Sequence, residues 1–132
     1  MGHVSMISLG IAINTDKKVI CIDGDGSVIM HMGNLTNIGS SNCKNLVHFV
    51  LNNGMHESVG IQPTLGFNIN IPKNCGYSYT VRIKTLDELN MILNDISPQK
   101  LDGPALIEVM ITNKVKYTHK LLRHKNTSIE RK

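Results

Sequence analysis

Four short apolar runs constrain the fold of this chain more than any other feature of its sequence. Each run is rich in β-branched residues and is bounded by Gly, Asn, Asp or Pro, which is the pattern of buried strands. They lie at residues 18–23 (KVICID), 45–52 (NLVHFVLN), 79–83 (YTVRI) and 104–111 (PALIEVMI). Such runs, when helices alternate with them, predict a mostly parallel sheet.

Segments with helical spacing do alternate with these runs. We expect helices over residues 6–13, 29–38 and 86–96. Thr85 and Glu88 form a capping-box pattern at the start of the last helix, and Pro98 is expected to end it. The alternation predicts an α/β fold, a three-layer open and mostly parallel sheet with helices on both faces.

The charge is divided unevenly along the 132 residues. The formal net charge is +4, but residues 114–132 carry seven Lys or Arg and one acid, whereas residues 1–113 carry seven basic and nine acidic residues. We therefore expect one domain over residues 1–113 and a basic C-terminal tail over residues 114–132. A slightly acidic body with three Tyr, two Phe and no Trp lacks the basic face and stacking platform that nucleic-acid binding needs, so we predict no nucleic-acid partner.

No feature of the sequence indicates a membrane or a secretory route. No apolar run approaches the ~18 residues of a membrane span, and the first residues lack a basic segment and a small-residue cleavage site. Cys21, Cys43 and Cys75 are odd in number and show no metal-ligand spacing, which fits reduced thiols. We expect a cytoplasmic protein without a membrane partner.

The stretch from residue 24 to residue 53 has the residues of a phosphate site. A predicted strand leads directly into Gly24-Asp25-Gly26-Ser27 and then into a helix. This arrangement delivers backbone N–H groups to the carboxyl edge of the sheet, where open α/β sheets bind ligands, and such groups favour anions. Asp25 would repel a phosphate there unless a cation lay between them, and Mg²⁺ is the cation that takes oxygen ligands from carboxylates and phosphates.

An Asn pair completes this pattern after the second predicted strand. Twenty-five residues separate GDG from Asn52-Asn53, which is enough for a helical crossover to return a parallel strand to the same edge. Asn53 would add a neutral amide oxygen to the cation shell. A GDG alone is ordinary turn chemistry, but together with the Asn pair it predicts a magnesium-bound phosphate or diphosphate.

These residues resemble the diphosphate-binding motif of thiamine-diphosphate-dependent enzymes, in which GDG is followed about 25 to 28 residues later by NN. The resemblance covers nearly the whole chain, to about residue 112. Within that superfamily, GDGSVIMHMGNLTNIG and LNNGMHESVGIQPT look like the diphosphate-binding, C-terminal domain of a 2-oxoacid decarboxylase acting on phosphonopyruvate. The sulfopyruvate decarboxylase β subunit is similar but tends to have Tyr where this chain has His56.

The resemblance implies roles for particular positions. Asp25 and Asn53 would bind Mg²⁺ through their side chains, and Met55 through its backbone carbonyl. The other cofactor contacts would come from Gly24, Gly26, Ser27 and His3. Met32, one helical turn beyond the phosphate loop, is our further candidate for a contact with the cofactor rings. His56 would be the catalytic group, in a substrate loop that also holds Ser58 and Gln62.

The implied activity is the conversion of phosphonopyruvate to phosphonoacetaldehyde and CO₂, in phosphonate metabolism, with thiamine diphosphate and Mg²⁺ as cofactors. These enzymes also need a pyrimidine-binding domain, whose glutamate protonates the cofactor, and none of Glu57, Glu88, Glu108 and Glu130 is an obvious substitute. We therefore expect a partner, as that domain or as an α subunit, in a homo- or hetero-oligomer. Two alternatives stay open, a sulfopyruvate decarboxylase β subunit and a non-catalytic remnant that binds cofactor or assembles with another protein.

Other positions depart from the pattern or have a simpler interpretation. The family's usual pair of glycines before QPT is here Gly60 and Ile61, which makes that loop bulkier, and the basic tail also differs from the family. Residues 60–78 are expected to form a long ordered loop with a short helix or turn. We expect His31 to start a helix and His48 to be a hydrogen-bonded structural residue in a strand.

Overall fold

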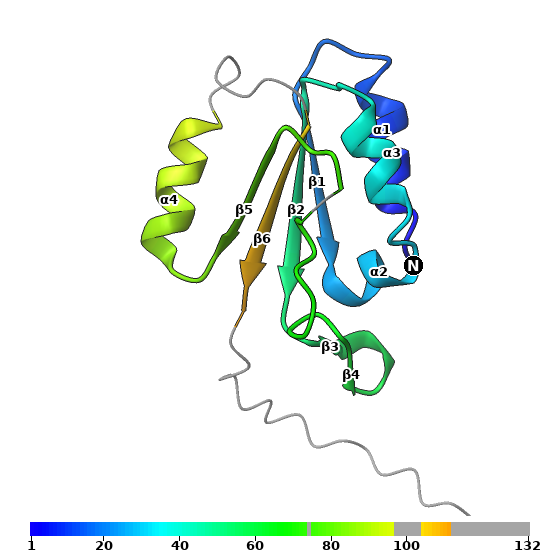
Figure 1. The fold of residues 1–132 in the computed structure, drawn as a ribbon, viewed down its shortest axis with the longest axis vertical. Helices are drawn as coiled ribbons and strands as arrows, with labels where there is room; N and C mark the ends of the chain where they lie inside the picture. The colour runs from blue at the N-terminus through cyan, green and yellow to red at the C-terminus, as the bar shows by residue number, and fades with distance from the viewer. Residues whose placement is uncertain (74, 97–103, 112–132) are drawn as a thin grey trace, which may run out of the picture.

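A parallel four-stranded sheet forms the centre of the molecule (Figure 1). The computed structural model describes residues 1–73, 75–96 and 104–111. The strands, in spatial order, are β1 (Val19–Gly24), β2 (Leu46–Asn52), β6 (Ala105–Met110) and β5 (Tyr79–Ile83), and every neighbouring pair is parallel. All four predicted strands are confirmed. Pro98 and the tail at residues 114–132 lie outside the described residues.

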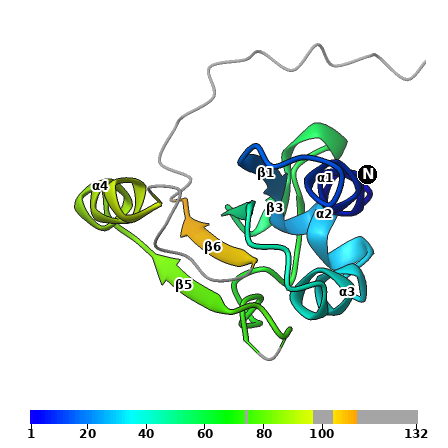
Figure 2. The ribbon, with the colours of Figure 1, turned by 90° about the horizontal axis from the view of Figure 1, so that it is seen from above.

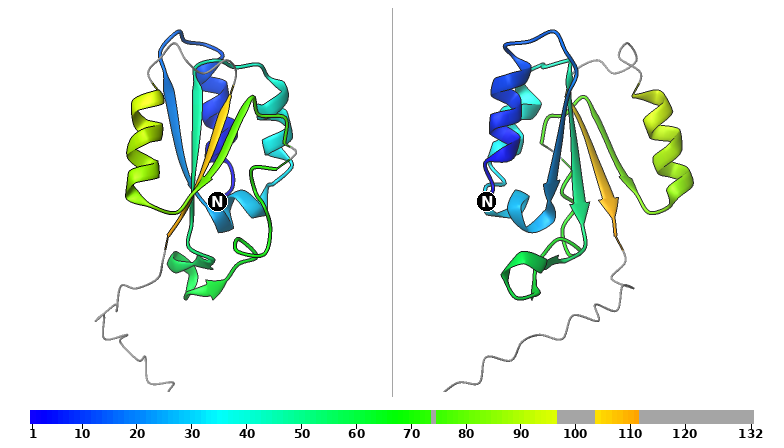
Figure 3. Two further views of the ribbon diagram at one scale, coloured as in Figure 1. Left: turned by 60° about the vertical axis from the view of Figure 1, so that its left-hand side comes forward. Right: turned by 180° about the vertical axis from the view of Figure 1, so that it is seen from behind.

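Helices lie on both faces of this sheet, as the alternation predicts (Figure 2). One face carries α1 (Val4–Ala12) and α3 (Asn34–Ser40), and the other carries α4 (Leu86–Asp95); Figure 3 shows the two helical layers from the side. Thr85 accepts a hydrogen bond from the Glu88 backbone N–H at 3.2 Å, and Glu88 accepts one from the Thr85 backbone at 3.0 Å, so the predicted capping box is confirmed. Among the described residues, no helix is long and apolar enough to cross a membrane.

The predicted helix over residues 29–38 is wrong, because the chain forms two shorter helices there. The first, α2 (Asp25–Met30), begins immediately after β1, and the second, α3, begins at Asn34. His31 therefore follows the end of a helix instead of starting one, with φ −131° and ψ 46°. Gly33 stands at the N-cap of α3, and glycine is a poor residue for a helix interior. The break allows α2 to stay at the sheet edge while α3 packs on the sheet face.

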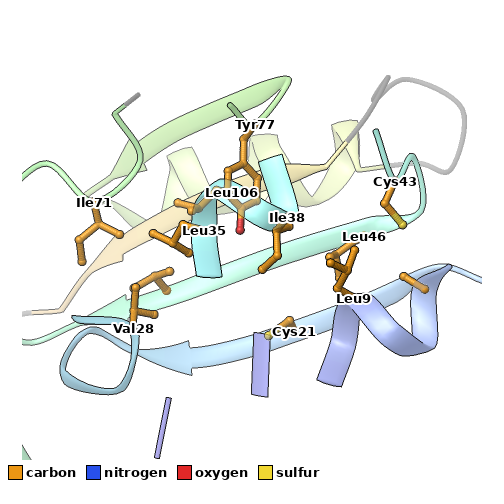
Figure 4. Close-up of a cluster of buried hydrophobic side chains, with 12 residues drawn as sticks. Leu9, Cys21, Val28, Leu35, Ile38, Cys43, Leu46, Ile71, Tyr77 and Leu106 are labelled. Atoms are coloured by element: carbon orange, nitrogen blue, oxygen red, sulfur yellow. The ribbon is translucent and has the colours of Figure 1, made fainter. Parts of the chain in front are cut away.

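Two hydrophobic clusters fill the space between the layers. The cluster under α1 and α3 includes Leu35, Ile38, Leu46 and Leu106 (Figure 4). The cluster under α4 consists of buried Val47, Phe49, Ile83, Ile92, Ala105 and Ile107. Because successive strand residues point to opposite faces, Leu106 and Ile107 of β6 serve different clusters.

An irregular segment covers β5 and β6 on the α3 side, where a helix would otherwise lie. Ile71 and Tyr77 anchor it in the cluster, with 0% and 8% of their surface exposed. Residues 60–73 and 75–78 thus form a loop with turns and one short strand, as predicted for this region. A Cβ at Gly39 would overlap the backbone of Cys75 and Gly76, so only glycine lets α3 and this segment approach so closely.

His48 is fully buried in β2, and only one of its ring nitrogens has a partner. Nδ1 lies 3.1 Å from the Tyr77 hydroxyl, whereas Nε2 lies 4.0 Å from Asp23 Oδ2 and neither of these two atoms is hydrogen-bonded. Burial lowers the pKa of His48 to about 4, although the charge of Asp23 acts in the opposite direction. His48 is therefore neutral at pH 7, and its contact with Asp23 is not an ion pair. The structural role is as expected, but the hydrogen bonding is incomplete.

The lowered pKa of His48 predicts a loss of stability in mild acid. The imidazole has a pKa of 6.5 in the unfolded chain and about 4 in the folded chain, so as pH falls from 6.5 to 4 the unfolded state binds the proton first. The free energy of unfolding should fall by about 3 kcal/mol over this window through His48 alone. Denaturant titrations of wild type and His48→Gln at several pH values measure the difference. Parallel curves for the two proteins would contradict the prediction.

Candidate functional site

The register of β1 and β2 brings the two predicted motif halves to one edge of the sheet. Gly24 pairs with Leu51, so Asp25 and Asn53 both follow at the carboxyl ends of adjacent strands. The helix α2 begins at Asp25, which is 1% exposed. The geometry is that of a ligand site at the carboxyl edge of an open α/β sheet.

A pocket of ≈ 530 Å³ lies at this edge. Such a volume is within the range of about 300–1,000 Å³ that small-molecule sites have. Eight of the predicted site residues line it, namely Gly24, Asp25, Gly26, Ser27, Asn53, Met55, His56 and Ser58. Its remaining lining comes from Met1, Leu51, Glu57 and Ile111, none of which the sequence assigns to the site.

His56 lies directly against the GDG turn. It belongs to β3 (Met55–His56), which pairs antiparallel with β4 (Gln62–Pro63) and precedes the 3₁₀ helix η1 (Glu57–Val59). A Cβ on Gly26 would overlap the His56 ring. The absence of a side chain at Gly26 therefore lets an imidazole, a group that can hold or release a proton near neutral pH, approach the turn.

The N-terminal residues are bound to the same turn. The Gly2 N–H donates to Ser27 Oγ at 2.9 Å, and the Gly2 carbonyl accepts from Asn34 Nδ2 at 3.3 Å. Because Ser27 Oγ accepts this bond, its hydroxyl hydrogen is available for an anionic ligand. The neighbouring His3 lies against His31, with ring centroids 4.5 Å apart and the ring planes tilted by 42°.

Three predicted contact residues are not brought into the pocket. His3 lies against His31, Met32 packs against the hydrophobic cluster under α1 and α3, and Gln62 lies on β4 beside His56. Met32 is displaced because the break after α2 turns it toward the core. A cofactor contact from any of the three stays a prediction.

The two asparagines of the NN pair have different surroundings. Asn53 lines the pocket, and its Oδ1 accepts a hydrogen bond from the Met55 N–H at 3.1 Å, which fixes the orientation of the amide. Asn52 is fully buried and donates from Nδ2 to the Gly66 carbonyl at 2.7 Å and to Glu108 Oε1 at 2.6 Å. Only the second asparagine can therefore offer an oxygen to a ligand in the pocket.

Thr64 and Gly66, which the sequence did not single out, hold the carboxylate of Asp25. Thr64 Oγ1 donates a hydrogen bond to Asp25 Oδ2 and accepts one from the Gly66 N–H at 3.1 Å. A Cβ at Gly66 would overlap both Asp25 and Asn52. The PTLG sequence is the local pattern that could have indicated these two residues, because a glycine close after a hydroxyl residue allows this close approach.

The donor atoms at the pocket suit a hard cation. Among the described residues there is no group of three or more His, Cys, Asp or Glu side chains that could hold a metal. At this edge Asp25 offers a carboxylate and Asn53 a neutral amide oxygen. Mg²⁺ binds in this way, with phosphate and water oxygens completing its shell. The residues present therefore fit a magnesium-bound diphosphate.

The bulkier loop before QPT has an unusual backbone. Gly60 and Ile61 both adopt left-handed conformations, with φ of 74° and 60°. Glycine tolerates this region, whereas a β-branched residue there is an outlier. The backbone thus gives a physical reason why glycine would suit both of these positions.

Fold and pocket together define an α/β domain with a candidate ligand site at the carboxyl edge of its sheet. Residues 1–109 match the family described as the thiamine pyrophosphate enzyme, C-terminal TPP binding domain. The chain belongs to this family.

Several known proteins are similar to this chain. A phosphonopyruvate decarboxylase of Streptomyces viridochromogenes is 39% identical over 114 residues, which cover 84% of this chain and 28% of that protein. A sulfopyruvate decarboxylase subunit beta of Methanocaldococcus jannaschii is 44% identical over 92 residues, which cover 67% of this chain and 48% of that subunit. The chain thus spans between about a quarter and a half of the length of these relatives.

A solved structure agrees with this assignment. The X-ray structure of a protein assigned as a thiamin diphosphate-dependent enzyme from Mycobacterium smegmatis superposes with a TM-score of 0.60 at 25% identity. The match covers 80% of this chain and 20% of that one. The same fold therefore occurs as one part of a longer polypeptide.

The backbone at Ile61 predicts that glycine stabilises this position. A left-handed conformation costs a non-glycine residue about 1–2 kcal/mol, and glycine loses about 0.5–1 kcal/mol more entropy on folding. Since Ile61 is 51% exposed, Ile61→Gly should raise the free energy of unfolding by up to about 1 kcal/mol in denaturant titrations. Val59→Gly, at an exposed position nearby without positive φ, should lower it. A decrease in Ile61→Gly similar to that in Val59→Gly would show that the backbone there is unstrained.

Proposed function

We propose that this chain is the diphosphate-binding part of a thiamine-diphosphate-dependent decarboxylase whose substrate is a small 2-oxoacid, phosphonopyruvate. The observation that carries the proposal is the pocket at the carboxyl edge, where the GDG turn, Asn53 and Met55 meet. Membership of the TPP-binding family and similarity to two phosphonopyruvate decarboxylases over 84% of the chain support it.

In this proposal Asp25, Asn53 and the Met55 carbonyl would hold Mg²⁺, which would offset the charge of the diphosphate. Thr64 donates a hydrogen bond to Oδ2 of Asp25, which would leave Oδ1 to serve as the ligand. The turn at Gly26 and the Ser27 hydroxyl donate hydrogen bonds to the phosphates. The chain thereby anchors one end of the cofactor and orients the other.

The cofactor, when bound, supplies an electron sink for the electrons released as the carboxylate leaves as CO₂. The net reaction takes up one proton in place of CO₂ and yields phosphonoacetaldehyde from phosphonopyruvate. His56, which lines the pocket against Gly26, is the group of this chain that we assign to hold or transfer that proton. Glu57, at the same pocket, is exposed on η1.

The proposal includes a partner that carries the pyrimidine-binding site. Glu88 caps the exposed start of α4, and Glu108 is buried against Arg82 and Asn52, so neither can reach a cofactor in the pocket. The missing glutamate would come from a separate subunit or from another part of a longer polypeptide. Similarity to β subunits of sulfopyruvate decarboxylases supports the first arrangement.

Sulfopyruvate is the second candidate substrate. The identity to the Methanocaldococcus jannaschii β subunit is 44% over 92 residues, which is higher than the 39% identity to the Streptomyces viridochromogenes phosphonopyruvate decarboxylase over 114 residues. Phosphonate and sulfonate are both tetrahedral anions. Among relatives that cover 84% of this chain, the two phosphonopyruvate decarboxylases are 39% and 37% identical and a sulfopyruvate decarboxylase subunit beta is 29% identical, which favours phosphonopyruvate.

Cofactor binding tests the metal site. In calorimetric titrations of the full chain with thiamine diphosphate, binding should require Mg²⁺ and should weaken in Asp25→Asn by more than about tenfold, since even outer-shell partners of a metal contribute 10–100-fold. The matched control is Asp16→Asn, at an exposed position before the amino end of β1, which should bind like wild type. Equal binding by Asp25→Asn and wild type would refute the assignment of Asp25.

Substrate identity is tested separately, in the complex reconstituted with a pyrimidine-binding partner. Steady-state kinetics on both acids should give a higher kcat/KM for phosphonopyruvate than for sulfopyruvate. The reverse order would favour the sulfopyruvate enzyme. Cofactor binding without turnover of either acid would favour a non-catalytic remnant.

A further inference from the structure

We propose that Glu108 is a positioning residue for the metal-binding carboxylate, acting on Asp25 through Asn52, Gly66 and Thr64. Glu108 lies on β6, outside the pocket lining. The inference deepens the proposed function and rests on it, because it takes Asp25 as a ligand of Mg²⁺.

Glu108 is a buried carboxylate in the middle of an apolar strand. It is 0% exposed, and β6 lies between β2 and β5. Burying a carboxylate without partners is costly, so such groups are found paired and hydrogen-bonded. Here Oε2 accepts from Arg82 Nε and Oε1 accepts from Asn52 Nδ2, both at 2.6 Å. Apolar residues often stabilise a core as well as a buried ion pair does, so packing alone does not account for Glu108.

Each partner of Glu108 also holds the backbone of the loop that crosses the site. Arg82 Nη2 donates to the Ile69 carbonyl, and Asn52 Nδ2 donates to the Gly66 carbonyl, both at 2.7 Å. The carboxylate thus joins two hydrogen bonds that fasten the loop at points three residues apart. Charge-assisted hydrogen bonds of this kind are stronger than neutral ones.

Glu108 also determines which way the Asn52 amide points. The Nδ2 group uses its two hydrogens on Gly66 and Glu108, while Oδ1 accepts from the Gly54 N–H at 3.1 Å. A reversed amide would place oxygen against oxygen at both Gly66 and Glu108. The carboxylate therefore favours one orientation.

The chain of contacts ends at the pocket. The Gly66 N–H donates to Thr64 Oγ1, and Thr64 Oγ1 donates to Asp25 Oδ2. The Thr64 N–H donates to the Gly54 carbonyl at 2.8 Å, so Asn52 and Thr64 both hold the turn after β2. With Oδ2 engaged in this way, the carboxylate of Asp25 has one orientation in which to present its other oxygen to a metal.

The experiment compares Glu108→Gln with Ile107→Val in the full chain. Glutamine keeps the shape of Glu108, but one of its two terminal groups is an N–H₂ donor. That group would face the donor of Arg82 or of Asn52, where a carboxylate oxygen accepts in the wild type. The control, Ile107, is the neighbouring residue of the same strand, equally buried but directed to the α4 face. Thr64→Val is a second variant, which removes the hydroxyl that donates to Asp25 and leaves Glu108 with its own partners.

Two measurements are made on each protein. The first is amide hydrogen exchange without ligand, in which Glu108→Gln should accelerate exchange at residues 65–69 and Ile107→Val should not. The second is a Mg²⁺ titration at fixed thiamine diphosphate, in which Glu108→Gln and Thr64→Val should weaken Mg²⁺ binding by about 10–100-fold and Ile107→Val should leave it unchanged.

The outcomes separate this inference from the proposed function. If wild type binds thiamine diphosphate with Mg²⁺ but Glu108→Gln and Thr64→Val bind Mg²⁺ as tightly, Glu108 is not a positioning residue. Unchanged exchange at residues 65–69 in Glu108→Gln also overturns the proposal. If wild type itself does not bind the cofactor, the proposed function fails. Accelerated exchange at residues 65–69 in Glu108→Gln would then still show that Glu108 stabilises the loop.

Discussion

The parallel pairing of β1 with β2 is the constraint on which the rest of the site depends. Since Gly24 lies opposite Leu51, the residues that follow each strand leave the sheet at the same edge and on adjacent strands. A slip of one residue in the pairing would turn every side chain of the shifted strand to the wrong face of the sheet. In β1 this would affect Asp23 and its apolar neighbours, and in β2 it would affect Asn52 and its apolar neighbours. The hydrophobic cluster under α1 and α3, which contains Cys21, Leu46 and Val50, opposes such a slip. Packing in the core therefore determines where the polar groups of the pocket stand.

Polar contacts then add precision that packing cannot supply. The loop after β4 covers β5 and β6 without a helix of its own, so its backbone polar groups need partners from elsewhere. Arg82, Asn52 and Thr64 provide them, and Glu108 connects the first two. The same contacts that satisfy the loop restrain Asp25. Fold stability and site geometry thus share one set of hydrogen bonds.

Much of this could be predicted from the sequence, because it depends on local patterns. The four strands follow from β-branched runs, the capping box from Thr85 and Glu88, and the meeting of GDG and NN from parallel topology. The break at residues 31–33 could not be predicted, since the apolar spacing continues through it and only packing decides between one helix and two. The same break explains why Met32 packs against the cluster under α1 and α3 and not at the pocket.

The network behind the pocket was harder to foresee. Glu108 is an acid inside an otherwise apolar run, which marks it as a residue needing a partner, but neither Arg82 nor Asn52 is near it in sequence. Asn53 is the candidate ligand in the sequence because it follows the strand, whereas the burial of Asn52 between Gly66 and Glu108 appears only in the structure. Ile61 was recognised as bulky, whereas its left-handed backbone appears only in three dimensions.

Paramagnetic NMR tests the central claim, a divalent cation at the carboxyl edge of β1 and β2. Mn²⁺ takes the same oxygen ligands as Mg²⁺ and broadens the amide signals of nearby residues. With thiamine diphosphate present, Mn²⁺ should broaden the signals of Gly26, Ser27, Asn53 and Gly54 and leave those of Val19 and Leu46, at the other end of the strands, sharp. Broadening centred elsewhere, or none at the GDG turn, would contradict the account.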